Sequence, residues 1–214
     1  MDLDTGMYPY TDGFNTTTGA VCIGLGVPEE VIETTVGVLS AVSAIRKDLF
    51  LAEIAREFPT RIKKTNDAYG SIESRFHNEY EMPGTEYAFG WTDLNLIRHA
   101  EILNKLSSIF LTHLDVLNDV ETIKLCKRYH GKDEETGAIF EKSLPTNIDT
   151  WEKLEPDFKE LPGWQQDISG VQSFSELPVE AQAFVRNIET ISKQKVEYVS
   201  VNDTRDEGIL RIMR

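Results

Sequence analysis

Short apolar runs that suit β-strands alternate along this chain with stretches that have the periodicity of amphipathic helices. Residues 34–45 (TTVGVLSAVSAI) are apolar and β-branched, which is typical of a buried strand. Residues 91–105 and 177–192 instead place apolar side chains three to four positions apart, which predicts helices with one buried face. Because strands and helices alternate, the sequence predicts an α/β architecture that extends over residues 1–214 as a single unit.

The remaining stretches have weaker but readable patterns. Four further apolar stretches predict strands, at residues 108–117, where the strand ends in a loop at Asp115, and at residues 121–131, 195–201 and 208–213. A charged stretch over residues 53–80 predicts mostly helix, and two stretches punctuated by Gly and Pro, residues 1–26 and 81–90, predict loops.

Charge and composition exclude several classes of protein. The chain has 22 Lys plus Arg against 36 Asp plus Glu, a formal net charge of −14, which disfavours binding to nucleic acid or to an anionic membrane. We expect no signal peptide, because the first residues are neither basic nor apolar, and no membrane span, because no apolar run reaches about 18 residues. Cys22 and Cys126 each lie in an apolar run, which indicates two buried free thiols in a cytoplasmic protein.

The common catalytic motifs are absent from the sequence. There is no GxxxxGK[ST] phosphate loop, no GxSxG, no HExxH, no CxxC and no EF-hand loop. The 4 histidines are scattered without metal-ligand spacing, at His77, His99, His113 and His130. The sequence therefore assigns no catalytic residue and no metal ligand to this chain.

One short segment has a chemical rationale. Residues Thr112, His113, Leu114 and Asp115 follow a predicted strand, and α/β sheets place ligands at the carboxyl ends of their strands. The Asp115 carboxylate could accept protons from N1 and from the 2-amino group of guanine together, a contact that adenine cannot make. The alternative is that Asp115 is a turn or cap residue, a common role for Asp after a strand.

The order of several blocks along the chain is similar to that of a known family. These blocks are residues 2–10 (DLDTGMYPY), 15–26 (NTTTGAVCIGLG), 90–94 (GWTDL), 111–117 (LTHLDVL), 161–164 (LPGW), 177–191 and 199–205. On these residues the chain resembles the C-terminal half of the adenylosuccinate synthetase family. The resemblance implies the C-terminal part of that fold, a P-loop-type α/β fold with extra helical and strand segments.

The resemblance also implies an activity for the family. Its members join aspartate to inosine monophosphate (IMP) with GTP and Mg²⁺, in purine nucleotide biosynthesis, and their phosphate loop and catalytic Asp and His lie in the N-terminal half. No block of this chain matches that half, so the resemblance implies no reaction and no cofactor for the chain alone. It implies instead a partner, which would be an N-terminal half or a full-length homologue, and assembly into a homo-oligomer, as family members are homodimers.

The guanine side of the site is the best matched by resemblance. The implied guanine-nucleotide residues are Thr112, His113, Leu114, Asp115, Ser200, Val201 and Asn202. His113 replaces the family's Lys, and Asn202 lies where a Gly is common, a position at which Asn can also adopt left-handed backbone angles.

The other two ligand sides depart from the family. The implied IMP-side residues are Asp12, Asn15, Thr16 and Thr17, and Asp12 replaces a Thr that contacts the 5′-phosphate. The implied aspartate loop contains Met82, Pro83, Gly84, Thr85 and Tyr87. It lacks the arginines of the family and has the acidic residue Glu86 instead. Like charge on a phosphate and the loss of bidentate Arg contacts both weaken anion binding.

Positions with an expected structural role match the family. Among them, Asp93 and Arg98 suggest a helix cap and an ion pair at a helix end. The sequence thus leaves three hypotheses. The chain is a divergent or truncated synthetase that acts with a partner, or a non-catalytic purine-nucleotide-binding or interaction module, or a fragment without its own role.

Overall fold

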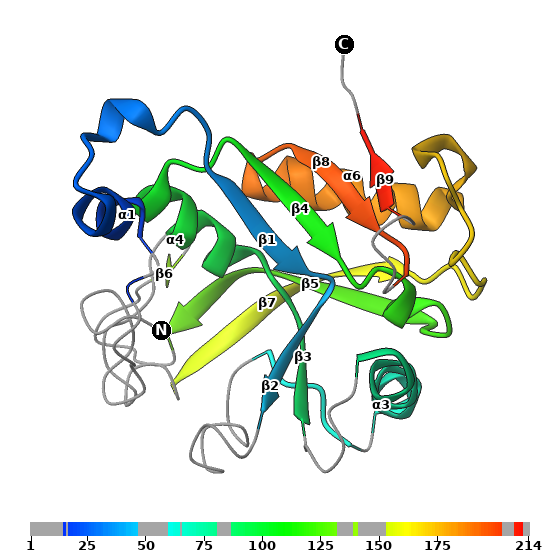
Figure 1. Ribbon diagram of the computed structural model, residues 1–214. Coiled ribbons are helices and arrows are strands. Elements are labelled where there is room, and N and C mark those ends of the chain that lie inside the picture. The colour runs from blue at the N-terminus through cyan, green and yellow to red at the C-terminus, as the bar shows by residue number, and fades with distance from the viewer. Residues whose placement is uncertain are drawn as a thin grey trace.

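Two mixed β-sheets and the helices around them form the fold (Figure 1). The computed structural model describes residues 15, 17–46, 60–64, 66–80, 87–131, 139–140, 153–202 and 208–211. The predicted α/β class is confirmed, with strands and helices alternating along most of the described chain.

The first sheet is mostly parallel and has the strand order β1-β4-β8-β9. Its strands are β1 (Val36–Ser40), β4 (Ser108–Thr112), β8 (Val196–Ser200) and β9 (Gly208–Leu210). Strands β1, β4 and β8 are parallel, so their carboxyl ends lie at one edge of the sheet, whereas β9 is antiparallel.

The second sheet is built around the long strand β5. Its strands are β2 (Val42–Arg46), β3 (Tyr87–Asp93), β5 (Thr122–Gly131), β6 (Ile139–Phe140) and β7 (Leu154–Pro162). Strand β5 pairs in parallel with β3 and antiparallel with β6 and β7.

The single strand predicted over residues 34–45 is wrong in one respect, since the chain changes sheets in the middle of it. Ala41 separates β1 from β2; its N–H donates to the Thr112 carbonyl at 2.9 Å, and its carbonyl accepts from Thr92 Oγ1 at 2.6 Å. Periodicity could not reveal this break, because both strands are apolar and both are buried in part.

Four α-helices and three 3₁₀ turns complete the described chain. They are α1 (Thr18–Leu25), α3 (Asp67–Tyr80), α4 (Leu94–Asn104), α6 (Val179–Ser192), η1 (Glu29–Val31), η2 (Asp115–Leu117) and η3 (Phe174–Glu176). The prediction for α6 is confirmed, since its apolar stripe, which includes Phe184 and Ile188, is buried.

Two predicted loops contain regular structure. Helix α1 lies within residues 1–26, and β3 begins inside residues 81–90. Gly suggested loops in both places, but β3 gains a complete antiparallel ladder with β2, which outweighs the local preference of one Gly. The helix predicted from Trp91 begins at Leu94, because Trp91 to Asp93 belong to β3.

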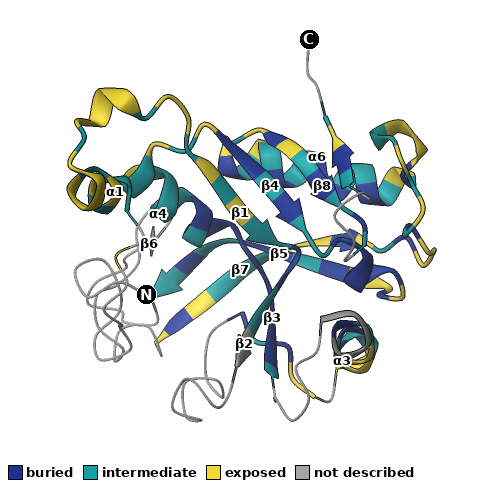
Figure 2. Ribbon diagram, in the orientation of Figure 1, coloured by how far each residue is buried: buried dark blue, intermediate teal, exposed yellow. Residues whose placement is uncertain are grey.

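One continuous core joins the two sheets. Leu111, Val199 and Phe184 are among its fully buried members, and Figure 2 shows the buried residues of β4 and β8 next to those of the second sheet. Both cysteines are free; Cys126 is buried as predicted, but Cys22 on α1 is half-exposed. No helix in the described ranges is long and apolar enough to span a membrane.

Candidate functional site

The two segments expected to contact guanine meet at the carboxyl edge of the first sheet. Strands β4 and β8 are direct neighbours with Leu111 opposite Val199, and just beyond this pair the Leu114 N–H donates to the Ser200 carbonyl at 3.2 Å. The structure therefore brings residues 112–115 and 200–202 together, although more than 80 positions separate them in the sequence.

A left-handed residue creates the turn after β4. His113 has φ 57°, a backbone conformation in which His is enriched relative to most residues other than Gly, Asn and Asp. The turn leads directly into η2, which begins at Asp115. Asp115 is only 1% exposed and lies beyond the carboxyl end of β4, where the sequence places it.

The His113 ring is held by its neighbours on both sides. Its Nδ1 lies 3.0 Å from the Ser40 Oγ at the end of β1 and 3.3 Å from the Thr112 Oγ1. The Phe76 ring of α3 lies edge-on to it, with 6.0 Å between the ring centroids. His113 thus links the ends of β1 and β4 to α3.

The second turn is closed by its own side chain. The Ser200 Oγ donates to the Asn202 carbonyl at 2.6 Å, and Val201 between them is fully buried. Left-handed backbone occurs at His113 and not at Asn202, so this turn does not use the left-handed angles that Asn tolerates.

A polar network behind η2 fixes the turn and was not anticipated as part of the site. The buried Asn118 accepts from Trp164 Nε1 at 2.9 Å and donates to Asp167 Oδ1 at 3.0 Å. The backbone N–H and hydroxyl of Ser169 both donate to Asp167, and they hold the pKa of that carboxyl below its usual range. The only sequence signal for this network is the LPGW block that contains Trp164.

Gly163 in the same block is required by close packing. A Cβ at this position would lie 1.6 Å from the Val120 carbonyl oxygen, which is backbone and cannot move aside. The Gly163 N–H donates to the Glu121 carbonyl at 2.8 Å, so the chain after β7 lies directly against the chain before β5.

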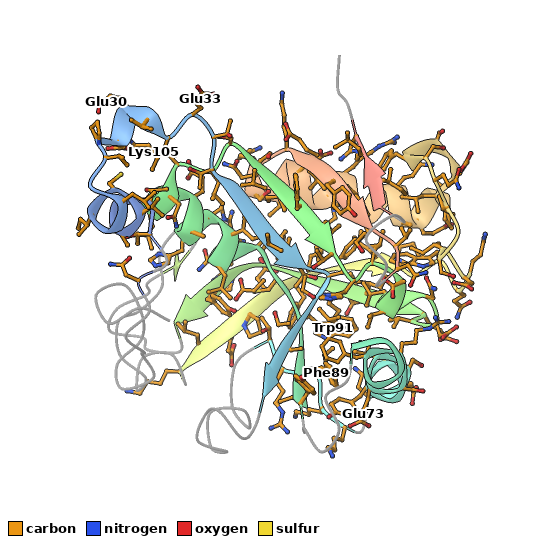
Figure 3. The ribbon with its side chains drawn as sticks, viewed as in Figure 1. Glu30, Glu33, Glu73, Phe89, Trp91 and Lys105 are labelled. Atoms are coloured by element: carbon orange, nitrogen blue, oxygen red, sulfur yellow. The ribbon has the colours of Figure 1, made fainter. Side chains whose placement is uncertain are left out.

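Tyr87 is the one residue of the expected aspartate loop that the structure describes; Met82, Pro83, Gly84 and Thr85 lie outside the described residues. The Tyr87 ring contacts the Phe76 ring edge-on, with 5.0 Å between centroids, and stacks on the Phe89 ring, with 6.3 Å between centroids. Figure 3 shows Phe89 and Trp91 beside α3, the helix that carries Glu73. Because Phe76 contacts both Tyr87 and His113, the end of this loop lies next to the guanine segments.

The described IMP-side residues lie elsewhere, at the start of α1; Asp12 and Thr16 lie outside the described residues. The Asn15 Oδ1 accepts from the Thr17 N–H at 3.0 Å and from its Oγ1 at 2.6 Å. The Thr18 N–H donates to Asn104 Oδ1 at the end of α4. These hydrogen-bonding groups are therefore engaged within the chain.

A cavity lies beside the start of α1, at the other end of the first sheet from residues 112–115 and 200–202. It has a volume of about 420 Å³ and is lined by Thr18, Asn104, Lys105 and three glutamates, Glu29, Glu30 and Glu33. Thr35 and Ser107 also line it and directly precede β1 and β4, so the cavity lies at the amino end of the sheet (Figure 3). The structure does not bring the described IMP-side and guanine-side residues together.

Asp93 has the structural role that the sequence suggests. Its Oδ1 accepts from the N–H groups of Asn95 and Leu96, which caps α4. Arg98, expected to pair at a helix end, donates to the Lys127 carbonyl of β5. Burial raises the pKa of Asp93 to about 6, against the opposing effect of the hydrogen bond from the Tyr129 hydroxyl.

Within the described ranges no three carboxylate, His or Cys side chains come together in a group that could hold a metal ion. The arrangement at the carboxyl edge offers a buried carboxylate, hydroxyls and an aromatic wall, which can recognise a base and orient it.

Comparison with known proteins identifies the lineage of this arrangement. A family model described as adenylosuccinate synthetase matches residues 1–209. The adenylosuccinate synthetase of Geotalea uraniireducens is 35% identical over 211 residues, which cover 98% of this chain and 46% of that protein. That of Paramecium tetraurelia is 32% identical over 212 residues, 99% of this chain and 46% of that protein.

A solved structure of the same family is also similar to this chain. The fully ligated adenylosuccinate synthetase from Plasmodium falciparum is similar with a TM-score of 0.84 and 29% identity, over 98% of this chain and 47% of that one. The chain thus spans about half the length of the relatives it matches. On a family match that covers nearly all of its residues, the chain belongs to the adenylosuccinate synthetase family.

Proposed function

We propose that the chain is part of a divergent adenylosuccinate synthetase, a ligase that joins L-aspartate to IMP while GTP is converted to GDP and phosphate. Its own contribution is recognition of the guanine base at the carboxyl edge of β4 and β8. The observation that carries this proposal is the joining of residues 112–115 to residues 200–202 through Leu114 and Ser200, in a chain of this family.

Asp115 is the residue that reads the base. A carboxylate that accepts from N1–H and from the 2-amino group distinguishes guanine from adenine and from hypoxanthine, which lacks the 2-amino group. Asp115 is 1% exposed, so a base reaches it only if the groups that cover it move aside, and the contact then forms away from water, where it is stronger. The Asn118 network keeps the turn in place while this happens.

The IMP and aspartate sides contribute less. Asn15 and Thr17 are engaged with each other, and the expected arginines of the aspartate loop are absent from residues 82–91. The sequence has no GxxxxGK[ST] phosphate loop, so we propose that groups outside this sequence hold the GTP phosphates and their metal. We therefore propose that the active assembly contains an N-terminal half or a full-length homologue, forms a homo-oligomer and acts in the cytoplasm.

Calorimetry with the full chain tests guanine recognition. We expect GDP to bind more tightly than inosine diphosphate, and ADP to bind most weakly, because each lost hydrogen bond to a charged partner costs about 1.5–3 kcal/mol. In Asp115→Asn the preference for GDP over inosine diphosphate should fall at least tenfold. The matched control is Asp119→Asn, since Asp119 lies in the same turn but is paired with Arg75 at 2.6 Å.

Two results would reject the assignment. One is equal affinity of the wild-type chain for GDP and ADP. The other is an unchanged GDP preference in Asp115→Asn when circular dichroism shows that the variant is folded.

A further inference from the structure

Strand β9 lies in the first sheet next to the turn at residues 200–202. It pairs antiparallel with β8, Gly208 with Ser200 and Leu210 with Tyr198, so it begins opposite the residue at which this turn starts (Figure 1). Strand β9 has 3 residues, and β8 is its one strand neighbour among the described residues. Because so short a strand makes few ladder hydrogen bonds, its position against β8 depends also on side chains that anchor it.

Arg211, directly after β9, contacts several elements at once. Its Nη1 donates to Glu189 Oε1 of α6 at 2.7 Å and to the Val196 carbonyl at 2.8 Å, and its Nη2 donates to Glu189 Oε2 at 3.4 Å. The Arg211 backbone N–H donates to the Glu197 carbonyl at 2.7 Å. The guanidinium carbon lies 4.0 Å from the centre of the Phe174 ring of η3. Arg211 thus joins β9 to α6, to η3 and to the start of β8.

The ion pair between Arg211 and Glu189 is largely sheltered from water. The two side chains are 10% and 18% exposed. Bidentate hydrogen bonds between a guanidinium and a carboxylate are about twice as strong as neutral ones, and the face of an aromatic ring attracts the cation further. The Glu189 carboxylate also accepts from the Val196 N–H at 3.0 Å, so β8 fixes it as well. A lysine at position 211 could not make the same contacts, because its ammonium lacks the planar fork.

The turn next to β9 is bonded to the Asp115 segment. The Leu114 N–H donates to the Ser200 carbonyl at 3.2 Å, and Leu114 directly precedes Asp115. On its other side Ser200 is paired with Gly208 of β9. A shift of β9 would therefore change where Ser200 lies relative to Asp115, and recognition of a base depends on such distances.

We propose that Arg211 is a positioning residue for guanine recognition. It acts through β9 and not by contact with the base. By holding β9 against β8 it keeps the 200–202 turn at a fixed distance from Asp115. The inference rests on the proposed function, since the base concerned is the guanine of that proposal, and it adds a residue that lies outside both guanine segments.

Calorimetry with the full chain tests this role. In Arg211→Lys we expect the preference for GDP over inosine diphosphate to fall about fivefold, because the turn loses its fixed distance from Asp115. The number of nucleotides bound per chain should stay the same, whereas partial unfolding would lower that number and leave the preference unchanged. Arg186→Lys is the matched control, since Arg186 lies 5.9 Å from the centre of the same Phe174 ring but donates to Gln182 within α6.

Amide hydrogen exchange tests the same role without nucleotide. The Leu114 N–H reports its hydrogen bond to Ser200. In Arg211→Lys its exchange should accelerate about tenfold more than the exchange of the β5 amides, because the loosening is local to the first sheet. A general loss of stability would accelerate both sets of amides equally.

Three results would overturn the inference. They are an unchanged GDP preference in folded Arg211→Lys, an equal loss of that preference in Arg186→Lys, and an acceleration at Leu114 no greater than in β5. Absence of a GDP preference in the wild-type chain would instead reject the proposed function, and the exchange of Leu114 would still decide whether Arg211 holds the turn. The two failures are therefore distinguishable.

Discussion

Asp93 stabilises the fold through its hydrogen bonds, but ionisation of its buried carboxyl has a free-energy cost that depends on pH. It caps α4 and accepts from the Tyr129 hydroxyl, but it is 3% exposed, and burial raises its pKa to about 6. The same burial raises the pKa of the neighbouring Tyr129 hydroxyl and Cys126 thiol above their usual ranges, so both stay protonated at neutral pH. Asp93 is thus the member of this cluster that titrates near neutrality.

The titration of Asp93 predicts a stability change with a definite sign. In the unfolded chain an Asp loses its proton near pH 3.9, whereas folded Asp93 keeps it until about pH 6, so stability falls as the pH rises between these values. Asp93→Asn keeps a capping oxygen and has no such loss. The difference in unfolding free energy, variant minus wild type, should therefore increase by roughly 2–3 kcal/mol from pH 4 to pH 7 in urea titrations.

Asp157→Asn is the control for this experiment. Burial acts to raise the pKa of Asp157, but hydrogen bonds and charge from Lys127 and Arg128 outweigh it and lower that pKa. The contribution of Asp157 to stability is lost only as the pH falls below about 4. Asp157→Asn should therefore show no comparable change between pH 4 and pH 7. A flat difference for Asp93→Asn would contradict the argument.

The residue whose position the sequence located best is Asp115. A strand followed by a short polar segment predicts a site at the strand's carboxyl end, and β4 ends at Thr112, three residues before Asp115. The contacts of His113 could not be predicted in this way, because its partners Ser40 and Phe76 come from other elements.

At the scale of elements, α1 and α6 are opposites. Helix α1 is apolar but has no buried residue, with Ile23 85% and Leu25 72% exposed, whereas α6 buries Phe184, Val185 and Ile188 completely. Composition alone would rank α1 as the more deeply buried of the two. Amphipathic spacing identifies α6 correctly, because it reports which face is apolar and not merely how apolar the helix is.

Truncation of one side chain in each helix should separate them. Ile23→Ala should change the free energy of unfolding by less than about 0.5 kcal/mol, since the side chain makes few contacts that unfolding would break. Phe184→Ala should cost about 3–5 kcal/mol, because it leaves a cavity in the core next to Trp164. Urea unfolding measures both, and a cost above about 1 kcal/mol for Ile23→Ala would mean that α1 is packed in solution.

The whole molecule is one core shared by two sheets, which meet where Ala41 joins β1 to β2. Residues 112–115 and 200–202 at the carboxyl edge lie away from Asn15 and Thr17, which precede α1 beside the amino end of the first sheet. A complete reaction site would need groups that bridge that separation and neutralise the phosphates.

The chain by itself should therefore form no adenylosuccinate. Incubated with GTP, IMP, L-aspartate and Mg²⁺, it should release no phosphate above a protein-free blank and give no adenylosuccinate by chromatography. The full-length Geotalea uraniireducens protein, assayed in parallel, is the positive control. Turnover by the chain alone would show that its 214 residues contain the phosphate-handling groups.

The sequence by itself determined the α/β class, the family, helix α6 and the position of Asp115 after β4, because these depend on periodicity and on short ordered blocks. Tertiary structure alone decided that residues 34–45 divide between two sheets, that β3 forms where Gly suggested a loop, and that the apolar side chains of Val38 and Leu210 stay exposed. The physical reason is that strand pairing and burial are set by partners distant in the sequence. Local pattern shows that a segment can be a strand, but only the folded chain shows which strand lies beside it and what covers its faces.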